Sequence, residues 1–283
     1  MTRDDRVKHL GAPDWGIGRV LEPEKDGKIK IFFAKAGLKV LTATAPLSRV
    51  TGPEASDPAL DNLLLGPKGL DSYRTLSELK KSFLKQFPDG FHGSSYQEKE
   101  RDYKVDAYRL ASKLLARDKF KNPLTSDDCD RMCEGAKRVL QATNLVFPNE
   151  KIKFLDALKS ERHRQQFAVA LFDILFDESS LEVRFVRLCD VLSEMAADKW
   201  TLATYFQFIC QPKRYMFMKP LVIIRAVEIC AFDLNYKPQP NWLTYQKLLK
   251  FAEYLKGALA DLQPRDMIDV QSFIWCTGEA ASG

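Results

Sequence analysis

The sequence predicts a multi-domain α+β protein in which a small five-stranded β-barrel is followed by a larger all-α domain. Two observations predict this fold class. Short alternating runs separated by turn signals occupy the first 53 residues, and apolar positions recur with a helical period through most of the remainder. The length of 283 residues and the hydrophobic content of 45% supply enough apolar side chains for a substantial core. We therefore expect domains at residues 1–53 and 73–283, joined by a linker at residues 54–72.

Five short β-runs lie between residues 6 and 50, and they read RVKHL, GIGRVLEP, GKIKIFF, GLKVLTA and PLSRV. Asp26-Gly27 separates two of them, as expected for a tight hairpin whose residues need positive φ angles. The alternation in KIKI predicts one face in the core and one in water. Gly16 and Gly18 stand where a strand must bend sharply, so the pattern is typical of a small SH3-like or Tudor-like barrel.

The segment TGPEASDPALD at residues 51–61 is rich in Pro, Ser and Asp and has no period, which predicts a linker. Beyond it, helix starts are marked by capping residues. Thr75 or Ser77 begins one helix, Ser126 and Ser160 begin two more, and Asn241 begins a long one near the end. Short connections between such helices favour an all-α assembly.

The bulk properties exclude several classes of protein. No apolar run is long enough to span a bilayer, and the N-terminus lacks a secretory signal, so we expect a cytoplasmic protein without membrane contact. The sequence has no phosphate-binding loop, dinucleotide fingerprint or nucleophile elbow. Its three histidines and six cysteines do not have the spacing of metal ligands. We therefore predict neither a cofactor nor a metal.

Positive charge is concentrated at the start of the chain. Residues 1–53 hold 10 Lys and Arg against 6 Asp and Glu, and so contribute +4 to the net charge of +5. Such a distribution permits binding to nucleic acid without requiring it.

The most specific motif is PDWGIGRV at residues 13–20, followed by KIFF at residues 30–33 and GLKVL at residues 37–41. This pattern resembles the small Tudor-like barrel at the tail of UvrD/PcrA-type helicases. It also resembles the RNA-polymerase-interacting domain of CarD and the transcription-repair coupling factor. The positions that fill it are Val7, His9, Gly16, Gly18, Val20, Ile31, Phe32, Gly37, Lys39 and Leu41. The whole chain is also similar to an uncharacterised bacterial family that joins this barrel to a helical domain of unknown function.

The resemblance implies a docking module rather than a catalytic one, since those barrels bind RNA polymerase or nucleic acid. We expect a basic, partly aromatic surface. It would contact either the phosphates of a nucleic acid, with DNA preferred over RNA, or an acidic groove of a protein. Its candidate residues are Lys8, Trp15, Arg19, Lys28, Lys30, Lys35 and Lys39. In the competing interpretation, Trp15 caps the core and the lysines form an ordinary solvated face.

The run from Tyr96 to Lys104 contains a second candidate site. Glu98, Glu100, Asp102 and Lys104 have the residue types of metal-dependent nucleases, in which carboxylates hold a cation near a phosphate. This region looks helical, however, and in a helix Glu100 and Lys104 form a stabilising pair on a solvated face. We favour the solvated face.

The leading hypothesis is a non-enzymatic adaptor or regulatory protein. Its barrel docks on RNA polymerase or nucleic acid, and its helical domain binds a second protein partner. The alternative is a metal-dependent enzyme that acts on nucleic acid through the acidic cluster. In a third interpretation the helical domain is an oligomerisation scaffold. Core packing is favoured for the two aromatic stretches, at residues 200–208 and 213–219. We assign no chemical role to these stretches or to the polar residues Asp266, Asp269 and Gln271 near Trp275.

Overall fold

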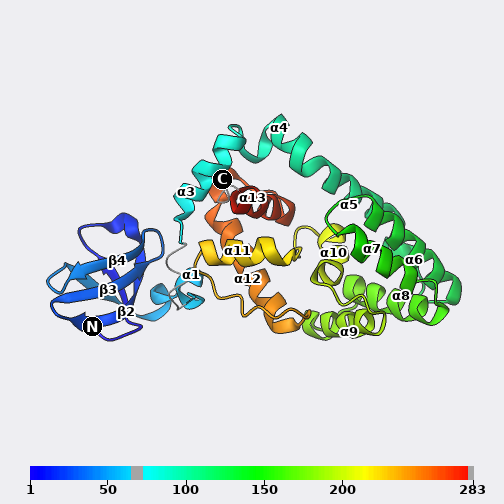
Figure 1. Ribbon diagram of the computed structural model, residues 1–283, viewed down its shortest axis with the longest axis horizontal. Helices are drawn as coiled ribbons and strands as arrows, with labels where there is room; N and C mark the ends of the chain where they lie inside the picture. The colour runs from blue at the N-terminus through cyan, green and yellow to red at the C-terminus, as the bar shows by residue number, and fades with distance from the viewer. Residues whose placement is uncertain (65–72, 280–283) are drawn as a thin grey trace.

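The computed structural model describes residues 1–64 and 73–279. An N-terminal antiparallel sheet of five strands is followed by a helical region, so the predicted α+β fold class is confirmed. Figure 1 shows the strands at one end of the molecule, helices α5 to α9 at the other, and α11 to α13 between them. No helix in the described ranges combines the length and the apolar character needed to cross a membrane.

The strands are β1 (Arg6–His9), β2 (Ile17–Lys25), β3 (Lys28–Phe33), β4 (Gly37–Thr42) and β5 (Leu47–Val50). They are ordered β4-β3-β2-β1-β5, and every neighbouring pair is antiparallel. Asp26 and Gly27 have φ angles of 53° and 72°, which confirms the predicted tight turn between β2 and β3. The sheet is consistent with a small barrel-like domain.

The sheet has apolar residues on both faces. Ile29, Ile31 and Phe33 of β3 point into one cluster together with Val7 and Val20, as the alternation predicts. Phe32 points the other way, on the side of the lysines, and joins a second buried cluster. The expected wet face is therefore partly covered by protein.

The helical region begins within the stretch predicted as a linker, because α1 (Pro58–Asp61) forms there with Asp57 as its N-cap. The longer helices are α3 (Leu76–Gln86), α5 (Asp102–Leu114), α6 (Ser126–Gln141), α7 (Pro148–Ala157), α8 (Glu161–Phe176), α9 (Leu181–Glu194), α10 (Trp200–Cys210), α11 (Pro220–Ile229), α12 (Trp242–Ala258) and α13 (Met267–Glu279). The short α4 (Ser94–Tyr96) leads into a π-helix at Gln97–Arg101.

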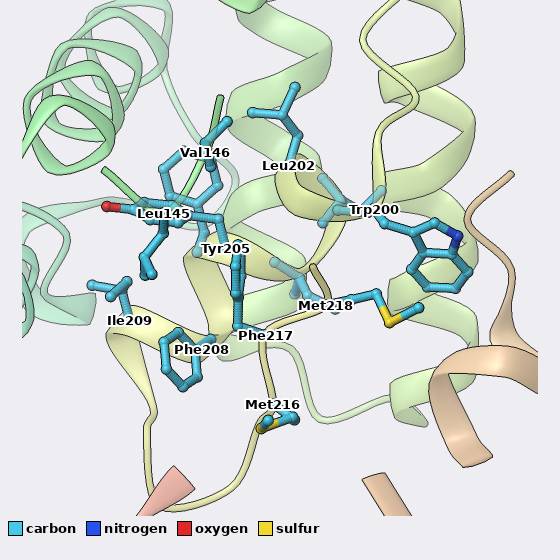
Figure 2. Close-up of a cluster of buried hydrophobic side chains, with 14 of the residues drawn as sticks. Leu145, Val146, Trp200, Leu202, Tyr205, Phe208, Ile209, Met216, Phe217 and Met218 are labelled. Atoms are coloured by element: carbon cyan, nitrogen blue, oxygen red, sulfur yellow. The ribbon is translucent and has the colours of Figure 1, made fainter. Parts of the chain in front are cut away.

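Most predicted helix starts are confirmed by their capping bonds. Thr75 begins α3 with a capping box, while Ser160 and Asn241 accept bonds from backbone amides in the first turns of α8 and α12. The start of α6 differs by one residue, since Thr125 rather than Ser126 is the N-cap. The large core contains both aromatic stretches, which confirms the packing interpretation. Figure 2 shows part of it, where side chains of α10 meet Met216, Phe217 and Met218.

The sheet is joined to the helical region through α1. Leu21 and Phe32 of the sheet pack with Leu60, Leu63 and Ala231 in one cluster. In the adjoining backbone, the Leu64 amide donates to the Ala231 carbonyl at 2.8 Å, and Leu63 forms an antiparallel bridge with Phe232.

Arginine side chains strengthen the same junction. Arg6 forms an ion pair of 2.7 Å with Asp61, and Arg19 donates to the Leu60 carbonyl at 3.0 Å. On the opposite side of α1, its contacts are made with α12.

Gly18 offers a test of the close packing inside the sheet. A Cβ atom at this position would lie 2.7 Å from Ile31 and 2.8 Å from Phe33, both of which are fully buried. We expect Gly18→Ala to lower the free energy of unfolding by about 1–3 kcal/mol through overpacking. The measurement is denaturant unfolding followed by far-UV circular dichroism.

Gly257→Ala in α12 is the matched control, because nothing lies within 4 Å of the added Cβ. It should leave stability unchanged or raise it by up to about 1 kcal/mol. A Gly18→Ala protein as stable as the wild type would contradict the packing described for this strand.

Candidate functional site in the helical region

A cavity of about 210 Å³ lies between the π-helix with α5 on one side and α13 on the other. We call it the lysine pocket because three lysine side chains line it. Its lining residues are Lys99, Glu100, Tyr103, Lys104, Asn144, Leu145, Lys219, Gln271 and Trp275. Three ammonium groups and one carboxylate make the wall positively charged on balance.

Four of these residues lie on one wall, two in the π-helix and two in the first turn of α5. Gln97–Arg101 is wound more widely than an α-helix, and α5 continues from it without a break. The wall residues Lys99, Glu100, Tyr103 and Lys104 straddle this transition. Single π-turns inside helices occur frequently at functional sites.

A buried ionic network holds the two walls together. Arg101 makes a two-pronged contact with Asp266, at 2.8 Å and 2.7 Å, and a further bond of 2.8 Å to Asp269. The Asp269 carboxylate also accepts from Tyr96 at 2.8 Å and from Arg265. These bonds tie the segment 96–101 to the start of α13.

The charge on Asp269 is preserved despite its burial. Burial by itself would raise the pKa of this carboxyl group, but hydrogen bonds from Arg265 and the charge of Arg101 lower the pKa below its usual value. Asp269 therefore stays ionised and continues to hold Arg101 in place. The network is a structural support beside the pocket, and none of its members lines the cavity.

Lys104 is the most deeply buried cation of the pocket. Its side chain is 1% exposed, and its Nζ atom donates to Ser272 Oγ at 2.8 Å and lies 3.6 Å from Glu100. Burial lowers the pKa of Lys104 to about 8, although the Glu100 charge opposes this shift. The amine can therefore gain or lose a proton close to neutral pH.

The opposite wall presents an amide and an indole ring. Gln271 is buried, and its Oε1 atom has no hydrogen-bond partner among the described residues. Trp275 lies under the Lys219 ammonium, with 4.6 Å between Nζ and the ring centroid, and Phe147 lies at 4.8 Å from the same atom. A ligand in this pocket would meet cations, the Glu100 carboxylate and an aromatic surface.

The sequence-predicted acidic cluster does not assemble. Glu98 and Asp102 are exposed, whereas Glu100 faces Lys104 in the pocket. Among the described residues, no group of three or more His, Cys, Asp or Glu side chains could hold a metal ion. The predicted pairing of Glu100 with Lys104 is present, but the expectation of a solvated face is wrong for Lys104, because α13 covers it.

Three of the six predicted cations of the sheet are paired with carboxylates. Lys8 lies 3.8 Å from Glu54, Arg19 pairs with Asp4 at 2.7 Å and Lys30 pairs with Glu22 at 2.8 Å. Ion pairs of this kind reduce the positive potential that a phosphate backbone would meet.

The remaining predicted residues of the sheet divide into two groups. Trp15 is half-buried, with its ring 5.1 Å from that of Phe33, and Lys39 Nζ lies 5.4 Å from the Trp15 ring centroid. Lys28 and Lys35 are exposed. The tryptophan thus caps the apolar cluster inside the sheet.

Sequence reasoning missed most of the pocket. Lys99 and Tyr103 belong to a run whose charge pattern is typical of a solvated helix, Asn144 lies in an uncharged connection before α7, and Lys219 belongs to an aromatic stretch that is mostly core. Gln271 and Trp275 stand together in the sequence, but nothing in their spacing predicts a pocket.

Lys104→Met tests the burial of the amine. Between pH 8 and pH 10.5 the unfolded chain binds more protons at this position than the folded protein does, so the wild type gains stability as the pH rises. Below pH 8 the amine is protonated in both the folded and the unfolded chain, so the folded protein bears the full free-energy cost of burying the charged amine. We expect the stability of the wild type relative to Lys104→Met to increase by up to about 3 kcal/mol across this window.

Urea unfolding at several pH values measures this difference. Lys99→Met is the matched control, because Lys99 is an exposed lysine on the same wall and should not alter the pH dependence. Identical pH profiles for the wild type and Lys104→Met would show that the amine is solvated.

The comparisons with known proteins concern only the start of the chain. Residues 2–50 match a family model described as "Protein of unknown function (DUF3553)". Neither a curated protein nor a solved structure matches the sequence. The match spans the five-stranded sheet and includes none of the residues of the lysine pocket.

Proposed function

We propose that the helical region binds a small anionic ligand in the lysine pocket. The observation that carries this proposal is the convergence of Lys99, Lys104 and Lys219 on one cavity. Lysine ammonium groups bind phosphate and carboxylate as point charges. Their attraction is stronger in a partly enclosed site than at an open surface.

The charges of the wall set the class of ligand. Phosphate and carboxylate groups are opposite in charge to the three lysine ammonium groups, and the cavity of about 210 Å³ has room for a small molecule. The supported ligand class is therefore a small phosphorylated or carboxylated compound.

Glu100 limits which anions suit the pocket. Its carboxylate, 3.6 Å from Lys104 Nζ, compensates part of the positive charge and repels an anion that approaches too closely. Lys99 and Lys219 are less buried than Lys104 and are the better candidates for direct contact. Lys104 then contributes mainly to the field within the cavity.

Binding of glycerol phosphate tests the proposal, because it is a small phosphorylated compound. Isothermal titration calorimetry on the full chain should detect binding that Lys99→Gln or Lys219→Gln weakens about five- to fiftyfold, as expected for losing a charge-assisted hydrogen bond. Lys113→Gln, at an exposed position of α5 outside the pocket, is the control. Equal affinities in all three variants would refute the site.

A second candidate function is docking of residues 1–53 on RNA polymerase or nucleic acid. It is supported by the resemblance of this segment to the barrels of helicases and polymerase-binding proteins. Lys28 and Lys35 are the fully exposed members of the predicted set, and edge strand β4 adds the exposed apolar side chains of Leu38 and Val40. This arrangement favours a protein groove over a phosphate backbone.

The salt dependence of DNA binding measures how many of these cations contact phosphates. Each neutralised phosphate contributes about −0.9 to the slope of log K against log salt, so Lys28 and Lys35 together give about −2, whereas all the predicted cations would give about −5. Fluorescence anisotropy with a labelled duplex measures the slope. Lys28→Ala/Lys35→Ala should bring the slope closer to zero by about 2. A slope near −5 would contradict the ion pairing of Lys8, Arg19 and Lys30.

A further inference from the structure

A second cavity, of about 530 Å³, adjoins the lysine pocket. Lys219 and Trp275 line both, so the two spaces meet at these side chains. Apart from them, the second cavity is lined mainly by Phe147, Pro220, Leu221 and Val222, and we call it the apolar groove. One end of the combined space is thus polar and cationic, and the other is apolar.

The apolar groove exposes large hydrophobic side chains. Leu221, in the first turn of α11, is 81% exposed, and Phe147, immediately before α7, is 42% exposed. Single exposed apolar residues are normal on a protein surface. Here two of them line the same cavity, and binding sites for small molecules are typically concave and mainly apolar.

The charges along the groove favour an anion at the end shared with the lysine pocket. Lys219 Nζ lies within 5 Å of the ring centroids of both Phe147 and Trp275, which places its positive charge at the junction of the two cavities. Glu150 is the carboxylate of the groove, and it accepts a hydrogen bond from Thr201 at 2.6 Å. Arg225 provides a further cation in the groove wall.

We propose that the lysine pocket and the apolar groove form one binding site for a single-chain anionic amphiphile. The anionic head lies between Lys99 and Lys219, and an unbranched alkyl chain follows the groove past Trp275 to Leu221. This inference rests on the proposed anion site and adds the class of ligand. Phosphate and carboxylate heads share the required chemistry, and the alkyl chain accounts for the apolar groove.

Chain length provides the first part of the test. Burial of one methylene group contributes about 0.8 kcal/mol, which corresponds to about a fourfold gain in affinity. Calorimetry on the full chain, below the critical micelle concentration, compares inorganic phosphate, octyl phosphate and decyl phosphate. We expect decyl phosphate to bind at least tenfold tighter than octyl phosphate, and octyl phosphate to bind tighter than inorganic phosphate. Decanoate in parallel distinguishes a carboxylate head from a phosphate head.

Two leucine variants provide the second part. Leu221→Asn places an uncharged polar group in the groove at a position exposed enough to leave the fold intact, and it should weaken decyl phosphate while leaving inorganic phosphate unchanged. Leu243→Asn is the matched control, because Leu243 is half exposed on α12 and does not line the groove. Decyltrimethylammonium, which has the same chain and the opposite charge, should bind at least tenfold more weakly than decyl phosphate.

The outcomes separate this inference from the anion site itself. If inorganic phosphate binds and decyl phosphate binds no tighter, the amphiphile inference is overturned and the anion site stands. If neither phosphate compound binds, both are overturned. Equal binding of decyl phosphate and decyltrimethylammonium would also overturn the inference, because the lysines would then play no part.

Discussion

The contact between Arg101 and two carboxylates, Asp266 just before α13 and Asp269 within it, is the constraint on which the lysine pocket depends. One wall of the pocket is carried by the π-helix and α5, and the other by α13, segments more than 160 residues apart in sequence. The short bonds from Arg101 to Asp266 and Asp269 set the distance between them. Removing one member would leave a buried charge without its partner, which is strongly destabilising. The network therefore provides the fixed frame for the lysines and Gln271.

The part of the fold that depends on local patterns could be predicted from the sequence. Alternation in β3, the Asp26-Gly27 turn and the capping residues Thr75 and Asn241 each express a preference that lies within a few residues. Helix α1 was not predicted, because its turn is short and composed of residues common in linkers. It forms where Leu60 can be buried between the sheet and Ala231, and this is a tertiary effect.

The candidate site was less predictable, since its properties come from burial by distant segments. Glu100 and Lys104 have the spacing of an ordinary surface pair, and they do pair at 3.6 Å. Whether such a pair is solvated depends on what covers it, and here Ser272 of α13 contacts the amine. No period in the sequence around residue 100 contains that information. The same holds for Arg19, which has the alternation of a surface cation but contacts Leu60 in the junction with α1.

Helix α11 links the two regions of the protein that carry candidate binding surfaces. Its first turn supplies Leu221 and Val222 to the apolar groove, and the carbonyl of its last residue, Ile229, accepts a hydrogen bond from Arg74. Just beyond it, Ala231 packs with Phe32 of the sheet. At a rise of 1.5 Å per residue, about 15 Å of helix separates the groove from the sheet junction. A ligand can shift a conformation only if its affinity differs between two states. If a ligand at Leu221 bound two conformations with different affinities, α11 would connect the groove to the sheet through packed residues. The opposite wall of the pocket is held by the Arg101 network.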